Sequence, residues 1–170
     1  MKEHDQQKIN EAILYVAQKV KNMYNILKVL YFADKSHLSK YGRFVINDVH
    51  IIMKRGPVPS FAYDLLKEWR GDGDFREILV DQAFDVKKSI VKPSREPDMD
   101  LLSPSDIECL DGAIINYGYM DWRELEKLSH EDPAYIETKQ NGEREIKIRT
   151  IAKYLDNATE VLEYIEQNCL

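Results

Sequence analysis

Residues 28–60 constrain the fold of this chain more strongly than any other segment. Apolar side chains at helical spacing lead into this segment and continue through it: Leu27, Leu30, Tyr31, Leu38 and Tyr41. At about 100° per residue, Asp34 falls in the middle of this apolar stripe. A carboxylate on an apolar helix face is costly to bury unless hydrogen bonds satisfy it. We therefore expect Asp34 to be held by a specific tertiary structure.

Two turns with restricted backbone conformations follow this helix. Gly42 is expected to end it. Residues 43–46 are β-prone, and residues 49–54 are expected to form their partner strand after the turn Asn47-Asp48. In Gly56-Pro57-Val58-Pro59 the glycine allows a positive φ, and each proline fixes its own φ. This tetrapeptide is predicted to connect a strand rigidly to a helix, and it is also a candidate preorganised recognition edge.

Helical periodicity and capping signals predict the elements around this segment. A helix is expected over residues 6–21, and Asn22 is expected to cap the helix that carries Asp34 and runs to Lys40. Ser60 is expected to cap a further helix that ends at Gly71. The segments after it are predicted to be an exposed turn at 71–74, short strands at 77–80 and 84–92, and a loop at 93–100.

The second half of the chain is predicted to be helical. Ser103-Pro104-Ser105-Asp106 has the pattern of a capping box with proline at the first helical position, and Asp121 starts a second helix in the same way. Pro133 is expected to open a brief further turn. Residues 143–148 are ambiguous between strand and loop, and residues 151–165 predict one final helix.

These elements predict a mainly α fold (α+β) with about six to seven helices and a small antiparallel β element. At 170 residues, the chain has the length of a single domain over residues 1–170. No apolar run approaches the ~18 residues that a membrane helix needs. The two cysteines, Cys109 and Cys169, lie far apart and are expected to be free thiols in a reducing compartment. We therefore expect a cytoplasmic protein with no membrane partner.

The charge of the chain limits its partners. The net charge is −6 and the sequence pI is about 5.3, so a broad phosphate-binding surface is not expected, and neither is a nucleic-acid partner. Basic residues gather within residues 144–153, but glutamates are interleaved with them. An acidic surface favours solubility and attracts basic protein partners.

Few residue patterns point to catalysis. Asp34 and His37 are one helical turn apart and could form an acid/base or ligand pair, but a carboxylate bonded inside the fold is the favoured interpretation. The four histidines are scattered, with no HExxH motif and no cysteine pair. A metal site assembled from Asp34, His37 and His130 stays open as an alternative. There is no GxSxG motif and no phosphate-binding glycine loop, so no cofactor is expected.

The residues quoted above resemble a known family. The run LYFADKSHLSKYGR (residues 30–43), then Asn47-Asp48, then MKRGPVPS (residues 53–60), is similar to the signature of the SocA-like Panacea domain. This family is also described as phage-associated GepA-like proteins. LSPSDIECLD (residues 102–111) and LEKLSHEDPAY (residues 125–135) are similar to its later block. The chain departs from the family at Phe44, where proline is frequent, and at Asn47, where glycine often precedes the aspartate.

The resemblance implies an antitoxin rather than an enzyme. Such proteins form type II-like toxin–antitoxin pairs, neutralise a cognate toxin by direct binding, and in one branch act as proteolytic adaptors for a AAA+ protease. The positions that match the family's pattern are Asp34, His37, Tyr41, Gly42, Arg43, Asp48, Gly56, Pro57, Pro59 and His130. We expect Asp34, Arg43 and Asp48 to form an ion-pair network that holds a partner-binding surface. The alternatives are a phage- or mobile-element-associated interaction protein without a toxin, and the metal-dependent enzyme described above.

Overall fold

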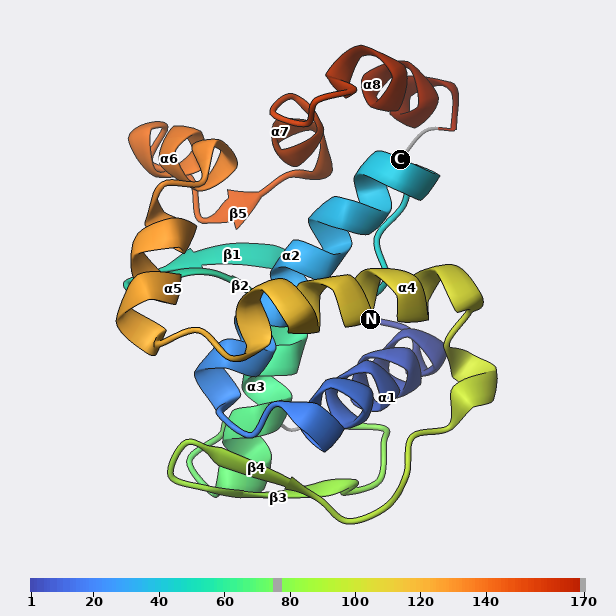
Figure 1. The fold of residues 1–170 in the computed structure, drawn as a ribbon, viewed down its shortest axis with the longest axis vertical. Helices are drawn as coiled ribbons and strands as arrows, with labels where there is room; N and C mark the ends of the chain where they lie inside the picture. Colours follow the sequence, from blue (N-terminus) through green and yellow to red (C-terminus); the bar gives the residue numbers. More distant parts are fainter. Residues whose placement is uncertain (75–77, 169–170) are drawn as a thin grey trace.

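Helix α2 (Met23–Tyr41) runs through the middle of the molecule, and the other elements surround it (Figure 1). The computed structural model describes residues 1–74 and 78–168. As predicted, the Asn22 side chain caps α2, and Gly42 ends it in the left-handed conformation with φ 71°. More of α2 is buried than one apolar stripe predicts, because α2 contacts α1, α3, α4, α5, α7 and α8. The residues of α2 that become buried in this way include the polar side chains of Asn25, Lys28, Asp34 and His37.

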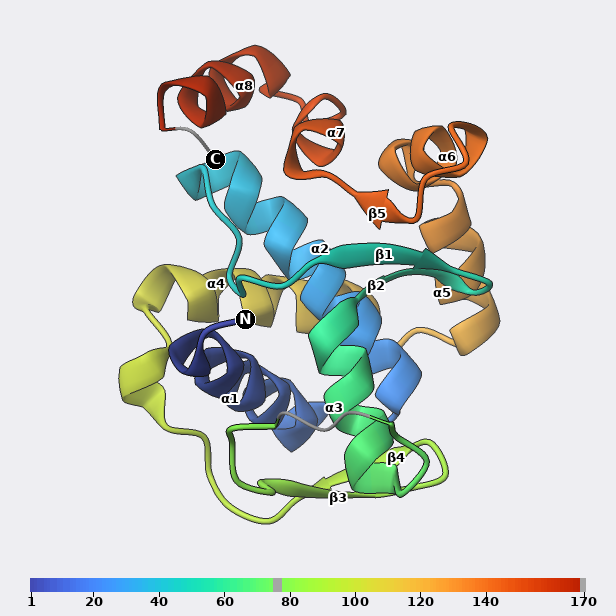
Figure 2. The same cartoon turned by 180° about the vertical axis from the view of Figure 1, so that it is seen from behind.

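The N-terminal half of α2 packs among three other helices (Figures 1 and 2). These are α1 (Glu3–Lys19), α3 (Ser60–Arg70) and α4 (Pro104–Ala113), and α4 continues into a π-helical turn, Ile114–Gly118. The periodicity of α1 is confirmed, since all four apolar side chains on its predicted face are buried: Ile9, Ile13, Val16 and Val20. The capping box at Ser103 is confirmed as well.

A small antiparallel sheet lies beside α2, and its strand pairing differs from the prediction. Strand β1 (His50–Met53) pairs with β2 (Gly56–Pro59) on one side and with β5 (Glu145–Ile146) on the other. Residues 54–55 form the turn between β1 and β2. The predicted strand at 43–46 is therefore wrong, and Gly56–Pro59 is a strand rather than a connector. Its two prolines are tolerated because β2 is an edge strand.

A second hairpin packs against α1 and α3 at the end of the molecule away from β5 (Figure 1). It consists of β3 (Phe84–Lys87) and β4 (Ile90–Pro93), as expected for residues 84–92. The strand predicted at 77–80 is not formed at residues 78–80, and residue 77 lies outside the described residues. The loop after β4 ends in a short 3₁₀ turn, Met99–Leu101.

The C-terminal elements pack against further parts of α2 and against the sheet. They are α5 (Trp122–His130), α6 (Pro133–Gln140), α7 (Ile148–Ala152) and α8 (Ala158–Gln167). Pro133 thus opens an eight-residue helix rather than a brief turn. The single final helix predicted at 151–165 is wrong, because the chain turns between α7 and α8. At this turn Asn157 Nδ2 donates to Ser39 O at 2.8 Å, and Ser39 Oγ donates to Asn157 Oδ1 at 2.9 Å.

The buried apolar side chains form two clusters, and α2 contributes to both. The larger cluster joins α1, α3 and α4 to the first half of α2, and the smaller joins Tyr31 and Leu38 to residues from α6, α7 and α8. The mainly α class with small antiparallel β elements is confirmed. A single domain over residues 1–170 stays a prediction. Within residues 1–74 and 78–168, no helix combines the length and apolar character needed to cross a bilayer. Cys109 is buried in α4, and Cys169 lies outside the described residues.

Candidate partner-binding site

Asp34 is fully buried and binds the backbone that follows its own helix. Its Oδ1 accepts hydrogen bonds from the backbone N–H groups of Val45 at 2.7 Å and Ile46 at 3.1 Å. Its Oδ2 lies 2.9 Å from Nε2 of His50, at the start of β1. Because the N–H groups of Val45 and Ile46 donate to the Asp34 carboxylate, they are not available for hydrogen bonds to a partner strand. Asp34 therefore fixes the path of the chain from α2 to the sheet.

Asp48, just before β1, likewise fixes the backbone at the start of α3. Its carboxylate accepts hydrogen bonds from the backbone N–H groups of Phe61 and Ala62, both at 3.0 Å, in the first turn of α3. Ser60 was expected to cap this helix, but Asp48 caps it from 12 residues earlier in the chain. Burial raises the pKa of Asp48, although these hydrogen bonds oppose the increase.

Asp106 joins three helices. It completes the capping box of α4 and lies 2.7 Å from Lys8 Nζ of α1 and 3.3 Å from His37 Nε2 of α2. Arg43 Nη1, just after α2, donates to the same carboxylate at 3.0 Å. Burial alone raises the pKa of Asp106, but the hydrogen bonds from His37, Lys8 and Ser103 together outweigh it and hold the pKa far below its usual range. The carboxylate is therefore ionised in the folded protein at neutral pH.

Asp132 and Lys28 connect α2 to the C-terminal elements and to the hairpin. Asp132 caps α6, accepts a hydrogen bond from Tyr31 Oη at 3.2 Å and pairs with Lys35. Lys28 is fully buried, and its Nζ donates to Pro57 O of β2 at 2.6 Å. Burial lowers the pKa of Lys28 to about 7. Each buried aspartate described here thus holds backbone N–H groups, and the resulting scaffold is specified by polar contacts.

The ion-pair network expected among Asp34, Arg43 and Asp48 does not form. Each of the three has different partners: the backbone of residues 45–46 for Asp34, Asp106 for Arg43, and the start of α3 for Asp48. Of the three, only Asp34 connects α2 to the chain that leads into the hairpin, whereas Arg43 binds α4 and Asp48 binds α3.

The alternative metal site is not assembled either. His37 Nδ1 lies 2.8 Å from Arg43 O and its Nε2 lies 3.0 Å from Ser105 Oγ, on the side of α4. His130 stacks on the ring of Tyr135 with centroids 5.1 Å apart, at the junction of α5 and α6. Asp34 faces His50 instead. In the described part of the chain, no group of three His, Cys, Asp or Glu side chains is placed to hold a metal ion.

The remaining family-motif residues are Tyr41 at the end of α2 and the glycine and prolines of β2. Tyr41 is 42% exposed, and its Oη donates to Glu108 Oε2 at 2.6 Å. Gly56 has φ 95°, and a Cβ there would collide with Ser129 Oγ and Lys28 Nζ. Pro57 supplies the carbonyl that Lys28 binds, and Pro59 precedes the first residue of α3. All four residues of β2 are buried, and two of them, Gly56 and Val58, line the cleft described next, so the preorganised recognition edge stays a prediction.

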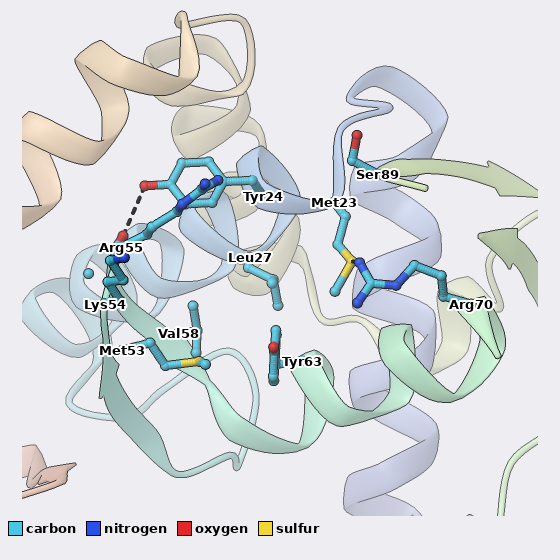
Figure 3. A pocket seen from close by; sticks show the side chains of 11 residues that line it. Met23, Tyr24, Leu27, Met53, Lys54, Arg55, Val58, Tyr63, Arg70 and Ser89 are labelled. Carbon is cyan, nitrogen blue, oxygen red and sulfur yellow. Dashed lines mark hydrogen bonds between the residues drawn. The ribbon is translucent and has the colours of Figure 1, made fainter. Parts of the chain in front are cut away.

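An open cleft of about 330 Å³ lies next to this hairpin (Figure 3). We call it the apolar cleft, and its apolar and aromatic walls come from α2, β1, β2 and α3: Met23, Tyr24, Leu27, Met53, Val58 and Tyr63. Its polar edge consists of Lys54 and Arg55 from the β1–β2 turn, Arg70 from the end of α3, and Ser89 from the β3–β4 turn. Among residues 1–74 and 78–168, no carboxylate lines it. A concave site with apolar walls and a few polar groups is typical of binding sites.

The edge of the apolar cleft is held in place by hydrogen bonds to the hairpin backbone. Burial raises the pKa of Tyr24 to about 12, so its hydroxyl stays protonated and donates to Arg55 O at 2.9 Å (Figure 3). The Arg55 guanidinium lies 5.2 Å from the centroid of the Trp122 ring. Arg70 donates to Asp72 through both Nε and Nη2, each at 2.7 Å.

Several residues of this scaffold and cleft were not singled out from the sequence. Lys28 was visible as a lone cation within an apolar run, and Asp132 stood directly before Pro133, where a helix cap is common. Asp106 was identified as a cap, but its contacts with Lys8 and His37 were not. The cleft had no local signal, since four separate segments of the chain contribute to it.

Comparison with known proteins identifies the family. Residues 26–136 match the family model described as antitoxin SocA-like, Panacea domain. This range contains most of α2 and all of the β1–β2 hairpin, α3, α4 and α5, and it also includes all four buried aspartates. A comparison with curated proteins found no match. A comparison with solved structures found none either. Because the match covers more than half of the chain, the chain belongs to the SocA-like Panacea domain family of antitoxin-like proteins.

Proposed function

We propose that this chain is the antitoxin of a type II-like toxin–antitoxin pair and neutralises a cognate toxin by binding it directly. The family match over residues 26–136 carries this proposal, because the family is antitoxin-like and is not a known enzyme family. The arrangement of side chains supports binding rather than catalysis. Asp34, His37 and His130 each serve a different structural contact, and the buried aspartates hold backbone N–H groups.

The test is a growth assay with the reading frame next to the gene for this chain. We expect that frame, expressed alone, to stop growth of the host, and we expect co-expression of this chain to restore it. The control is Asp34→Ala, which removes the acceptor of two buried N–H groups and is expected to lower the amount of folded antitoxin. A toxic neighbouring product that the folded wild-type chain does not neutralise would contradict the proposal.

Delivery of the toxin to a AAA+ protease is a further step that the family resemblance implies. It predicts that the toxin's half-life falls when this chain is co-expressed, and that the fall disappears in a host lacking the protease. Neutralisation with an unchanged toxin half-life would show inhibition by binding alone. An interaction protein of a phage or mobile element without a toxin predicts no toxic neighbouring product.

A further inference from the structure

The apolar cleft differs from the rest of the molecule in its charge. The chain has a net charge of −6, yet the described residues that line this cleft include three cations and no carboxylate. A cleft with this lining attracts a negatively charged group, which the acidic remainder of the surface repels.

Lys54 and Arg55 are the charges most available to a partner. Both are exposed, and neither forms an ion pair with any residue in the described ranges. Arg70, by contrast, is already neutralised by two hydrogen bonds to Asp72. Arg55 is positioned by the Trp122 ring, so its guanidinium loses less freedom when a carboxylate binds.

Three hydrogen bonds to backbone carbonyls hold the hairpin that carries these two cations. Tyr24 Oη binds Arg55 O, Lys28 Nζ binds Pro57 O at 2.6 Å, and Tyr135 Oη donates to Met53 O at 3.3 Å. The two cations on the turn therefore present a preorganised positive edge. This arrangement also gives the buried Lys28 a role: it anchors the strand that leads from the charged turn.

The walls of the apolar cleft suit an apolar side chain. Met23 and Met53 line it, and methionine adapts its shape to different neighbours because its side chain is unbranched and flexible. Leu27, Val58 and Tyr63 point toward the centre between the two ends of the cleft (Figure 3). A volume of about 330 Å³ is near the lower limit for ligand pockets, which fits one or two side chains better than a whole cofactor.

We propose that the apolar cleft binds an acidic segment of the toxin, in which one or two large apolar side chains enter the cleft and flanking Asp or Glu side chains pair with Lys54 and Arg55. This inference rests on the proposed function, because it names the part of the toxin that the antitoxin recognises. Recognition of an apolar anchor with charged flanks in a groove is a common mode of peptide binding. The binding energy is expected to concentrate in the apolar anchor and the central charge pairs.

The test compares two charge-reversal variants in binding to the purified product of the neighbouring reading frame. The double variant Lys54→Glu/Arg55→Glu is expected to weaken binding at least about tenfold and to reduce growth rescue. The matched control is Lys147→Glu/Arg149→Glu, which reverses two cations in the segment around β5 and α7 that contributes nothing to the cleft. The control is expected to change affinity less than about twofold. Circular dichroism melts must show that both variants fold.

A photo-crosslinking amino acid at position 53 identifies the occupant of the cleft. We expect a cross-link to a toxin peptide that contains a large apolar residue with Asp or Glu nearby, and no equivalent cross-link from position 147. A cross-link to a basic segment, to a second copy of this chain or to no protein would overturn the inference. Equal loss of binding in the two charge variants would overturn it as well. If Lys54→Glu/Arg55→Glu neutralises the toxin as well as the wild type does, only this inference fails. If the wild-type chain itself neutralises no toxin, the proposed function fails too.

Discussion

Individual buried polar residues specify this fold at the residue scale. Asp34, Asp48, Asp106 and Asp132 are each at most 6% exposed, and each accepts a hydrogen bond from at least one backbone N–H group. A buried N–H group without a partner is costly, so each carboxylate makes one chain path much more favourable than its alternatives. This explains why an acid on the apolar face of α2 is compatible with a stable core.

Replacing Asp34 tests this explanation directly. Asp34→Ala leaves the N–H groups of Val45 and Ile46 without their acceptor, and we predict a loss of about 3 kcal/mol or more in the free energy of unfolding. Asp34→Asn is the matched control, because its amide oxygen can still accept from both N–H groups, so its loss should be clearly smaller. Urea unfolding measures both. Equal stability of Asp34→Ala and the wild type would contradict the structural role.

The buried lysine makes a prediction about pH. Lys28 has its pKa lowered to about 7 by burial, while in the unfolded chain it lies near 10.5. Between these values the unfolded chain binds more protons, so this residue makes the wild type more stable as pH rises, by up to about 1.4 kcal/mol per pH unit. Its full destabilising effect is present below pH 7.

Lys28→Met removes this titration while keeping a long side chain. Relative to the wild type, the variant should therefore lose stability steadily as pH rises from about 7 to about 10, in addition to a constant loss from the missing hydrogen bond to Pro57 O. Urea unfolding of both proteins at several pH values measures the difference. A constant difference between the two proteins over this range would contradict the assignment.

At the scale of elements, the β1–β2 hairpin depends on a glycine that touches α2 and α5. Gly56 has φ 95°, and a Cβ there would collide with Ser129 and Lys28. Gly71, which ends α3 with φ 89°, has open space around it. The two glycines therefore separate the cost of backbone strain from the cost of a steric collision.

We predict that Gly56→Ala destabilises the protein by about 3 kcal/mol or more, since it adds overpacking to an unfavourable backbone conformation. Gly71→Ala should cost only about 1 kcal/mol, the backbone strain alone. Thermal melts of the two variants provide the comparison. Similar losses in both variants would show that the hairpin is not packed as closely as the structure indicates.

The elements with local signals were predictable from the sequence, and those set by distant contacts were not. Asn22, Gly42 and the capping box at Ser103 mark helix ends through neighbouring residues, and all three were correct. The strand pairing was wrong because Asp34 claims the N–H groups of residues 45–46 across the fold. The break between α7 and α8 depends on Asn157 binding Ser39, 118 residues away. The apolar cleft needs the complete tertiary structure for the same reason.

At the scale of the whole molecule, polar clusters tie separate helices together. Asp106 connects α1, α2 and α4 through Lys8, His37 and Arg43. The basic residues near the C-terminus are balanced in a different way, by surface pairs: Lys147 with Glu143, Arg149 with Glu166, and Lys153 with Glu137. Exposed pairs of this kind contribute little to stability, whereas removing one partner from the buried Asp106 cluster is expected to be strongly destabilising, because it leaves a buried charge unpaired.

The Asp106 cluster predicts the acid sensitivity of the protein. The pKa of Asp106 is lowered by folding, so its contribution is fully present above about pH 4 and is lost as pH falls further. Asp106→Asn should be less stable than the wild type at pH 7, and the difference should shrink between about pH 4 and pH 2. Urea unfolding across this range measures it. A difference that stays constant or grows on acidification would contradict the prediction.

At this scale, we propose that the chain neutralises a toxin by binding it directly. The most direct measurement is a calorimetric titration of the purified chain into the purified product of the neighbouring reading frame, combined with an assay of that product's toxicity at each ratio. We predict saturable binding, with toxicity disappearing at the same molar ratio at which the binding sites are filled. Loss of toxicity without detectable binding, or tight binding that leaves the product fully toxic, would contradict the claim.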